Sequence, residues 1–185
     1  FQDLVSGLDE AGRLVVLDLG TASTEMLALL SRARSRVEIA DFAHFGGIDS
    51  LNDAEPGPEL HAAADSWILE QSGDEPLDLV LCWDLPNYLS LDALSALMSA
   101  IGRRSRPGAL AHALIFYSHR EMRDRPGRFI PTIDGELTDY GGAGTTVAAP
   151  RYSPEDLQIN MRPFEIDCGR LLSNGMQEYL LRLAP

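Results

Sequence analysis

Short, continuous apolar runs constrain the fold of this chain more than any other feature. Residues 14–19 and 77–83 are apolar throughout, except for Asp18 and Asp78, and residues 109–117 read as a further strand. A strand that is apolar on both faces is typical of a parallel sheet covered by helices on each side. The runs therefore predict buried strands in an α/β protein.

Amphipathic stretches alternate with these runs. Residues 25–33 have apolar side chains at helical spacing, and a helix with Ser90 as N-cap is expected to continue to about Arg104, before Pro107-Gly108. Residues 36–41 are expected to form a second strand and residues 42–59 a loop. Residues 60–71 fit either a strand and turn or a helix.

The C-terminal part has a different pattern. Apolar runs at 163–172 and 176–183 are separated by Ser173-Asn174-Gly175, and Asn-Gly between such runs is a strong hairpin signal. The chain as a whole is therefore expected to be a single α/β domain over residues 1–185. Its mostly parallel sheet would be flanked by helices and would end in an antiparallel hairpin.

Residues 119–150 interrupt this order. They hold five glycines and three prolines, so we expect a lid or a disordered loop. Gly141-Gly142-Ala143-Gly144 is similar to a phosphate loop, but no strand precedes it and no lysine follows, which favours a flexible loop. A short helix is expected to begin at Ser153-Pro154, with proline in the first turn.

The charge of the chain limits its partners. A net charge of −13, from 28 acidic and 15 basic residues, disfavours nucleic acid and anionic membranes as main partners. No apolar run is long enough for a transmembrane helix. Cys82 and Cys168 show no metal-ligand spacing, so we expect reduced thiols, no metal site and a cytoplasmic location.

Four segments in this order resemble the class I S-adenosylmethionine-dependent methyltransferases. They are "VVLDLG" opening into a helix, "RVEIAD" ending in an acid, "LDLVLCWDLPNYL" followed by a helix and "RPGAL", and the terminal hairpin. Asp18 and Asp41 lie 23 residues apart, which is typical of the first two motifs of this family. The resemblance implies a Rossmann-like methyltransferase fold, S-adenosylmethionine as cofactor, and a small molecule or protein as methyl acceptor.

The resemblance also implies roles for particular residues. Asp18 and Gly20 would lie beside the methionine part of the cofactor, and Asp41 would accept hydrogen bonds from the ribose hydroxyls. Asp65 would contact the adenine amino group only if residues 60–65 form a strand. Asp84 ends a strand at the edge of the sheet where ligands bind in such folds.

The catalytic group is less well defined. Asp84, Tyr88 and His119 are the candidates, with Asn87 lining the same mouth, whereas a core position is favoured for His112 because it lies within a strand. Structural roles remain open for these residues, and Asp18 could simply tie down the turn that follows it.

Ala22 and Thr24 occupy positions that are glycine in a dinucleotide-binding turn. Thr24 is expected to cap the following helix, and Glu25 would repel a pyrophosphate, so NAD and FAD are disfavoured. The two substitutions leave an alternative: a non-catalytic methyltransferase-like protein with a filled crevice, acting through protein–protein contacts. A sheet edge at the terminal hairpin could mediate a homodimer.

Overall fold

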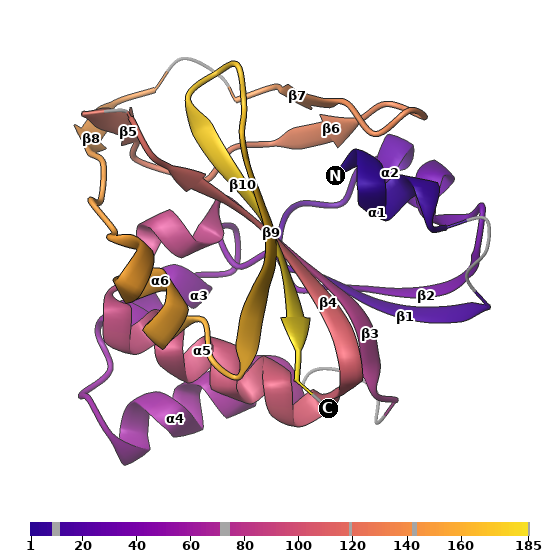
Figure 1. Ribbon diagram of the computed structural model, residues 1–185. Helices are drawn as coiled ribbons and strands as arrows, with labels where there is room; N and C mark the ends of the chain where they lie inside the picture. Colours follow the sequence, from indigo (N-terminus) through magenta and orange to yellow (C-terminus); the bar gives the residue numbers. More distant parts are fainter. Residues whose placement is uncertain (9–11, 71–74, 119, 142–143, 185) are drawn as a thin grey trace.

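The structure is a computed structural model, and it describes residues 1–8, 12–70, 75–118, 120–141 and 144–184. A six-stranded sheet in the order β2-β1-β3-β4-β10-β9 forms its centre (Figure 1). Its strands are β1 (Arg13–Asp18), β2 (Arg34–Ile39), β3 (Leu77–Trp83), β4 (Ser105–Phe116), β9 (Phe164–Leu171) and β10 (Met176–Leu183). The first four are parallel to one another and the last two are antiparallel to their neighbours, which confirms the predicted fold class.

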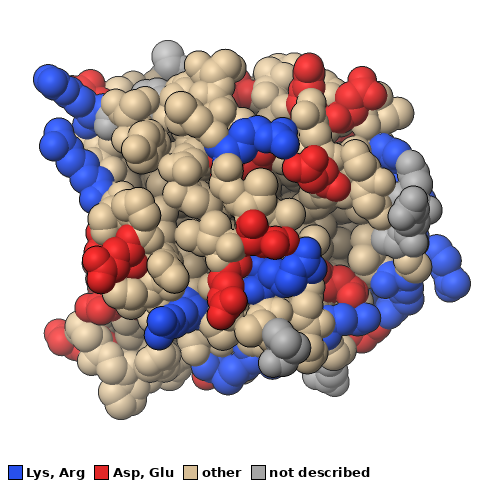
Figure 2. Space-filling model, in the orientation of Figure 1, with Lys and Arg blue, Asp and Glu red and all other residues tan. Residues whose placement is uncertain are grey.

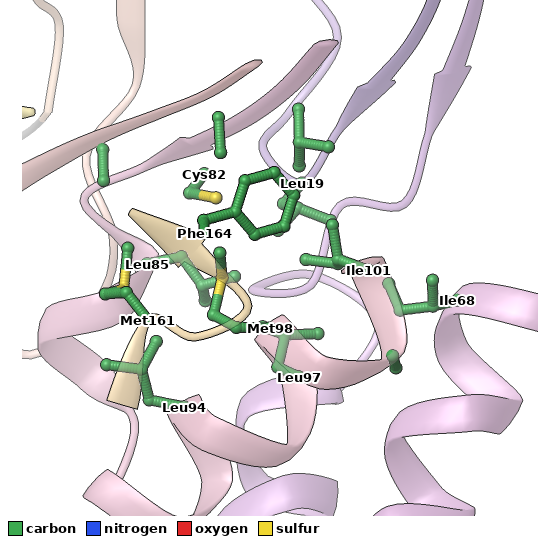
Figure 3. Packing of buried hydrophobic residues seen from close by; sticks show 14 of the residues in the cluster. Leu19, Ile68, Cys82, Leu85, Leu94, Leu97, Met98, Ile101, Met161 and Phe164 are labelled. Atoms are coloured by element: carbon green, nitrogen blue, oxygen red, sulfur yellow. The ribbon is translucent and has the colours of Figure 1, made fainter. Parts of the chain in front are cut away.

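Helices cover both faces of this sheet. On one face lie α1 (Gln2–Ser6) and α2 (Thr24–Leu30), and on the other lie α3 (Gly47–Asn52), α4 (Pro58–Asp65), a π-helical turn (Ser66–Glu70), α5 (Leu91–Arg104) and α6 (Pro154–Asn160). Each face buries its own hydrophobic cluster. Figure 3 shows the cluster on the face that α5 covers, where Phe164 of β9 packs among side chains of α5 such as Leu97, Met98 and Ile101.

Helix α5 forms where the sequence predicts it. The hydroxyl of Ser90 accepts a hydrogen bond from the Ala93 amide over 3.2 Å and so caps the helix. Its apolar stripe, including Leu94, Leu97 and Ile101, is buried. Arg103 and Arg104 in the last turn suit the negative end of the helix dipole.

Two sequence expectations are corrected, and one alternative left open by the sequence is decided. Ser23, not Thr24, caps α2, and its hydroxyl accepts a hydrogen bond from the Met26 amide. Residues 42–59 are not entirely a loop, since they contain α3 and the start of α4. Residues 60–65 form part of helix α4 rather than a strand, because Leu60 and Ala64 lie one helical turn apart and are both buried.

The terminal hairpin is confirmed. The Leu172 amide donates to the Met176 carbonyl and the Gly175 amide to the Leu172 carbonyl, which closes a three-residue turn. Gly175 has a φ of +82°, the left-handed conformation that a turn of this kind places on glycine.

The excursion that begins after β4 contains two short antiparallel ribbons, which differs from a structureless loop. One pairs β5 (Glu121–Arg123) with β8 (Thr146–Ala148), and the other pairs β6 (Phe129–Pro131) with β7 (Leu137–Asp139). Figure 1 shows both ribbons along the edge of the sheet where β3 and β4 end. The excursion therefore lies at the same edge of the sheet as the carboxyl ends of β1 and β2, where Asp18, Gly20 and Asp41 are found.

Candidate active site

A small crevice lies between the carboxyl ends of β1 and β3. The chain passes from β1 outward to β2 and then returns to the other side of β1 as β3, so this is the point where the strand order reverses. In open parallel sheets ligands bind at such a point. Gly20 follows β1, Asp41 follows β2, and Asp84 follows β3, and all three line the crevice.

Trp83 fills one side of this crevice. Its indole N–H donates a hydrogen bond to Oδ1 of Asp18 over 2.6 Å, and the Gly20 amide donates to the same oxygen over 2.9 Å. A Cβ on Gly20 would lie 2.6 Å from Cδ1 of Trp83 and 2.9 Å from its Nε1. Glycine at position 20 therefore leaves room for an indole ring.

The backbone of Trp83 is also unusual. Its φ is +51°, in the left-handed region that bulky side chains rarely adopt, and Asp41 has a φ of +39°. Strained residues of this kind persist where the surrounding structure fixes them, and they cluster at functional sites. Here both residues lie at strand ends around one crevice.

The carboxylate of Asp41 uses only one of its two oxygens for hydrogen bonds to described residues. Its Oδ1 accepts hydrogen bonds from the Thr21 hydroxyl and the His44 amide, each over 3.3 Å. Its Oδ2 has no hydrogen-bond partner within the described residues, so it is free to accept bonds from a ligand.

Asp84 is the most deeply buried acid of the site. Its Oδ2 accepts a hydrogen bond from the Gly127 amide over 2.8 Å, while its buried Oδ1 has no partner among the described residues. Burial raises the pKa of Asp84 to about 6, against the opposing effects of the Gly127 amide and Arg123. Burial likewise raises the pKa of Asp18 to about 6, although the bonds from Trp83 and Gly20 favour its charged form.

The excursion closes the crevice from above. Phe129 stacks on Trp83, with ring centroids 6.0 Å apart and planes inclined by 9°. The Tyr88 hydroxyl donates to the Arg125 carbonyl over 2.8 Å. Arg123 bonds to Asp139 over 2.6 Å, which ties the two ribbons together. The excursion thus contacts the crevice directly, in the position that a lid would occupy.

The closed crevice has a volume of only about 30 Å³. That is room for a water molecule, far below the 300–1,000 Å³ of typical ligand pockets. A much larger open cleft of about 750 Å³ adjoins it between α3, the η2 turn (Leu85–Tyr88) and the β5–β8 ribbon. The two cavities share Ala43 and Pro126 as lining residues, so they are direct neighbours.

Comparison with solved structures identifies the fold. A methyltransferase from Clostridium acetobutylicum aligns over 100% of this chain and 90% of its own, with a TM-score of 0.56 and 13% identity. The Burkholderia thailandensis 1,6-didemethyltoxoflavin-N1-methyltransferase, solved with S-adenosylhomocysteine, aligns over 100% of this chain and 77% of its own, with a TM-score of 0.54 and 17% identity. CalS10, a Micromonospora echinaspora amino pentose methyltransferase solved with S-adenosylmethionine, aligns over 99% of this chain and 88% of its own, with a TM-score of 0.55 and 12% identity.

This chain has the fold of the S-adenosylmethionine-dependent methyltransferases. No family model and no curated protein matches its sequence. The assignment of the methyltransferase fold is thus based on the arrangement of helices and strands, from the first helix to the terminal hairpin.

Asp65, one of the predicted site residues, lies away from the crevice. The role of Asp65 required a strand over residues 60–65, and the structure places a helix there. Its carboxylate forms an exposed ion pair with Arg103 of α5. Asp65 is therefore not positioned beside Gly20 and Asp41.

The catalytic candidates differ in their availability. Tyr88 is held by the Arg125 carbonyl, and burial and the nearby Asp84 raise its pKa, which disfavours a role as base. Among the described residues, the side-chain amide of Asn87 bonds to backbone atoms alone, at Asp84, Leu114 and Phe116, so it supports the strand ends. His119 lies outside the described residues.

His112 is a core residue, in line with the sequence interpretation. It is buried, its Nε2 lies 2.9 Å from Glu178, and its ring contacts Trp83 edge-on. Burial lowers its pKa, although Glu178 opposes this effect.

Sequence reasoning missed Trp83 and Phe129 as components of the site. The sequence does contain a signal for Trp83. It is an aromatic residue at the predicted end of a strand, directly before the candidate Asp84, so it is expected at the same edge of the sheet. Phe129 gave none, since its contact with Trp83 depends on how the excursion folds back. Within the described residues no helix could cross a membrane, and no group of potential ligands could hold a metal ion.

Proposed function

We propose that this chain binds S-adenosylmethionine in the crevice and transfers its methyl group to a small molecule or a protein. The observation that carries the proposal is the charge of the crevice. Asp41 and Asp84 line it, Asp18 lies directly behind Trp83 and Gly20, and no lysine or arginine is among its lining residues. Such a site suits a cationic sulfonium and opposes a pyrophosphate.

The chain's own groups suit this ligand. Oδ2 of Asp41 is free to accept hydrogen bonds from a ribose diol, and charged acceptors make the stronger bonds. The cofactor would supply an activated methyl group. Asp84, with a raised pKa, would orient the acceptor and take up a proton where the acceptor must lose one.

Binding requires the lid to open. The cavity of about 30 Å³ must grow roughly tenfold or more, so the Trp83 indole must leave Gly20 and the Gly127 amide must leave Asp84. The adjoining cleft of about 750 Å³ offers the acceptor a place next to the crevice. Ligand binding and lid movement are therefore coupled in this proposal.

Titration calorimetry with S-adenosylhomocysteine tests the proposal. Wild type should bind, and Asp41→Asn should bind at least about tenfold more weakly, because a charged hydrogen bond contributes about 1.5–3 kcal/mol. Asp65→Asn is the matched control and should bind like wild type, because its carboxylate lies on the surface with Arg103. Equal affinities for wild type and Asp41→Asn would contradict the assignment of Asp41.

A second function is favoured by one observation: Trp83 and the lid fill the crevice. In that case the chain is a non-catalytic member of the fold that acts through protein–protein contacts. Trp83→Ala separates the two proposals. Binding by wild type supports the methyltransferase. Binding by Trp83→Ala alone, or by neither protein at millimolar ligand, supports the non-catalytic alternative.

A further inference from the structure

The outer edge of β9 is unpaired. β9 is the last strand of the sheet, and it pairs on its inner side with β10, from Leu171 opposite Gln177 to Phe164 opposite Leu183. Every residue of β9 after Phe164 is exposed. Within the described part of the chain no other strand pairs with this edge, and such an edge is a template for another strand.

The two faces of β9 differ in character. The ladder with β10 shifts register at Asp167, which bulges between Ile166 and Cys168. Residues opposite one another share a face, so the bulge sorts the strand into two sets. Beside Tyr179 and Leu181 lie Phe164, Ile166, Gly169 and Leu171, and beside Glu178, Leu180 and Arg182 lie Glu165, Cys168 and Arg170.

The apolar set is incompletely covered. Ile166 is 38% exposed and Leu171 is 63% exposed, on the same face of the edge strand. Between them Gly169 has no side chain, and the Tyr179 ring of β10 covers its backbone, 3.3 Å from where a Cβ would lie. Covering this strip would remove apolar surface from water.

We propose that β9 pairs antiparallel with β9 of a second copy, about a two-fold axis through Cys168. Antiparallel strands related by such an axis keep each residue on the same face of the joined sheet. With the bulged Asp167 left out of the ladder in both copies, Glu165 lies opposite Arg170 of the second copy, and Ile166 lies opposite its Gly169. Each pair occurs twice because the interface is two-fold symmetric.

The charges of this edge favour a second copy as the occupant. The chain as a whole carries −13, yet the charged residues of β9 and the neighbouring Arg182 balance: Glu165 and Asp167 against Arg170 and Arg182. Asp167 already bonds to Arg182 over 2.8 Å. Figure 2 shows acidic and basic side chains interspersed on one face of the molecule, in the orientation of Figure 1.

Glu165 and Arg170 are then the pair left for contact between copies. Glu165 has no partner within the described residues. Arg170 bonds to Asp3 over 3.1 Å, at an exposed position, and its guanidinium has five donors, so it can bond to a second carboxylate as well. The bulge at Asp167 keeps the ladder short, which predicts a weak, concentration-dependent dimer rather than a permanent one.

Cross-linking through Cys168 tests the register. Directly opposed residues in an antiparallel pair have Cα atoms about 4.5–5.5 Å apart, within reach of a disulfide. Mild oxidation of concentrated protein should therefore give a covalent dimer on non-reducing gels, and Cys168→Ser should abolish it. Cys82 is buried and cannot substitute. Failure of wild type to cross-link where sedimentation shows a dimer would overturn the register.

Charge reversal tests the pairing itself. In sedimentation equilibrium, Glu165→Arg or Arg170→Glu should weaken dimerisation about tenfold, since like charges then face each other twice. The double variant restores opposite charges and should recover most of the affinity. Glu55→Arg, at an exposed position in the segment before α4, is the control and should not change it. A monomer at all accessible concentrations, or equal dimerisation by all four proteins, would overturn the proposal.

Discussion

The indole N–H of Trp83 bonds to Oδ1 of Asp18 over 2.6 Å, and this bond lays the ring across Gly20. The same carboxylate oxygen accepts the Gly20 amide. The first motif of the fold is thus joined directly to the end of β3, and the closed state of the crevice depends on contacts between two segments that are far apart in sequence.

A double-mutant cycle measures this closure. Gly20→Ala should destabilise the wild-type protein by about 1–3 kcal/mol, because the added methyl group collides with the Trp83 ring. In a Trp83→Ala background the same change should cost much less, since the collision is absent. Urea unfolding of the four proteins provides the free energies. Equal costs in the two backgrounds would mean that Trp83 does not occupy this space in solution.

Burial of Asp84 predicts a pH effect on stability. Its folded pKa of about 6 lies above the ordinary value of 3.8, so its contribution is fully present below about pH 4 and is lost as the pH rises through 6. A shift of about two units corresponds to about 3 kcal/mol. Asp84→Asn should therefore gain stability relative to wild type between pH 5 and pH 7.5.

Thermal unfolding at several pH values checks this prediction. Other titrating groups, such as buried His112, contribute equally to both proteins and cancel in the difference. Asp53→Asn, at an exposed position, controls for the loss of one surface charge. Parallel stability curves for Asp84→Asn and wild type would show that Asp84 is not buried as described.

The first part of the site could be predicted from the sequence, and the reason is geometric. Asp18, Gly20, Asp41 and Asp84 all end or follow strands of a parallel sheet, so one sheet edge gathers them whatever the side chains between them do. The terminal hairpin was equally predictable, because its turn depends on local sequence around Gly175.

Other parts depend on contacts distant in sequence. Residues 60–65 fit both a strand and a helix, and packing of Leu60 and Ala64 in the hydrophobic cluster around α5 accompanies the helix. The ribbons of the excursion have strands of three residues, too short for a periodic pattern. The indole of Trp83 could not be placed, since its position depends on Asp18 and on Phe129 of the lid.

The left-handed backbone of Asp41 predicts a specific order among its variants. Asp41→Ala should destabilise the protein by about 1–2 kcal/mol, because alanine resists a φ of +39°. Asp41→Asn should cost less, since asparagine tolerates this conformation. Urea unfolding gives the comparison, and Asp65→Ala in helix α4 is a surface control. Asp41→Asn as costly as Asp41→Ala would indicate that the charge, not the backbone, matters for stability.

Gly127 offers a way to loosen the lid. A Cβ there would lie 2.6 Å from Nη2 of Arg123 and 2.9 Å from Cε2 of Phe129, so Gly127→Ala should disturb both contacts. Trypsin should then cleave at the arginines of the excursion several-fold faster than in wild type. Gly144→Ala, whose Cβ would lie no closer than 3.6 Å to a neighbour, should behave like wild type. Unchanged cleavage of Gly127→Ala would argue against a closed lid.

Three of the hydrogen bonds that attach the lid to the body use main-chain atoms of the lid. The Gly127 amide, the Arg125 carbonyl and the Ile133 carbonyl form hydrogen bonds with Asp84, Tyr88 and Arg32. A main-chain atom is the same in every amino acid, so the side chains of residues 125 and 133 can diverge among descendants of this chain without releasing the lid. The side chains on which closure depends are instead Asp84, Tyr88 and Arg32 in the body, together with Phe129 of the lid where it stacks on Trp83.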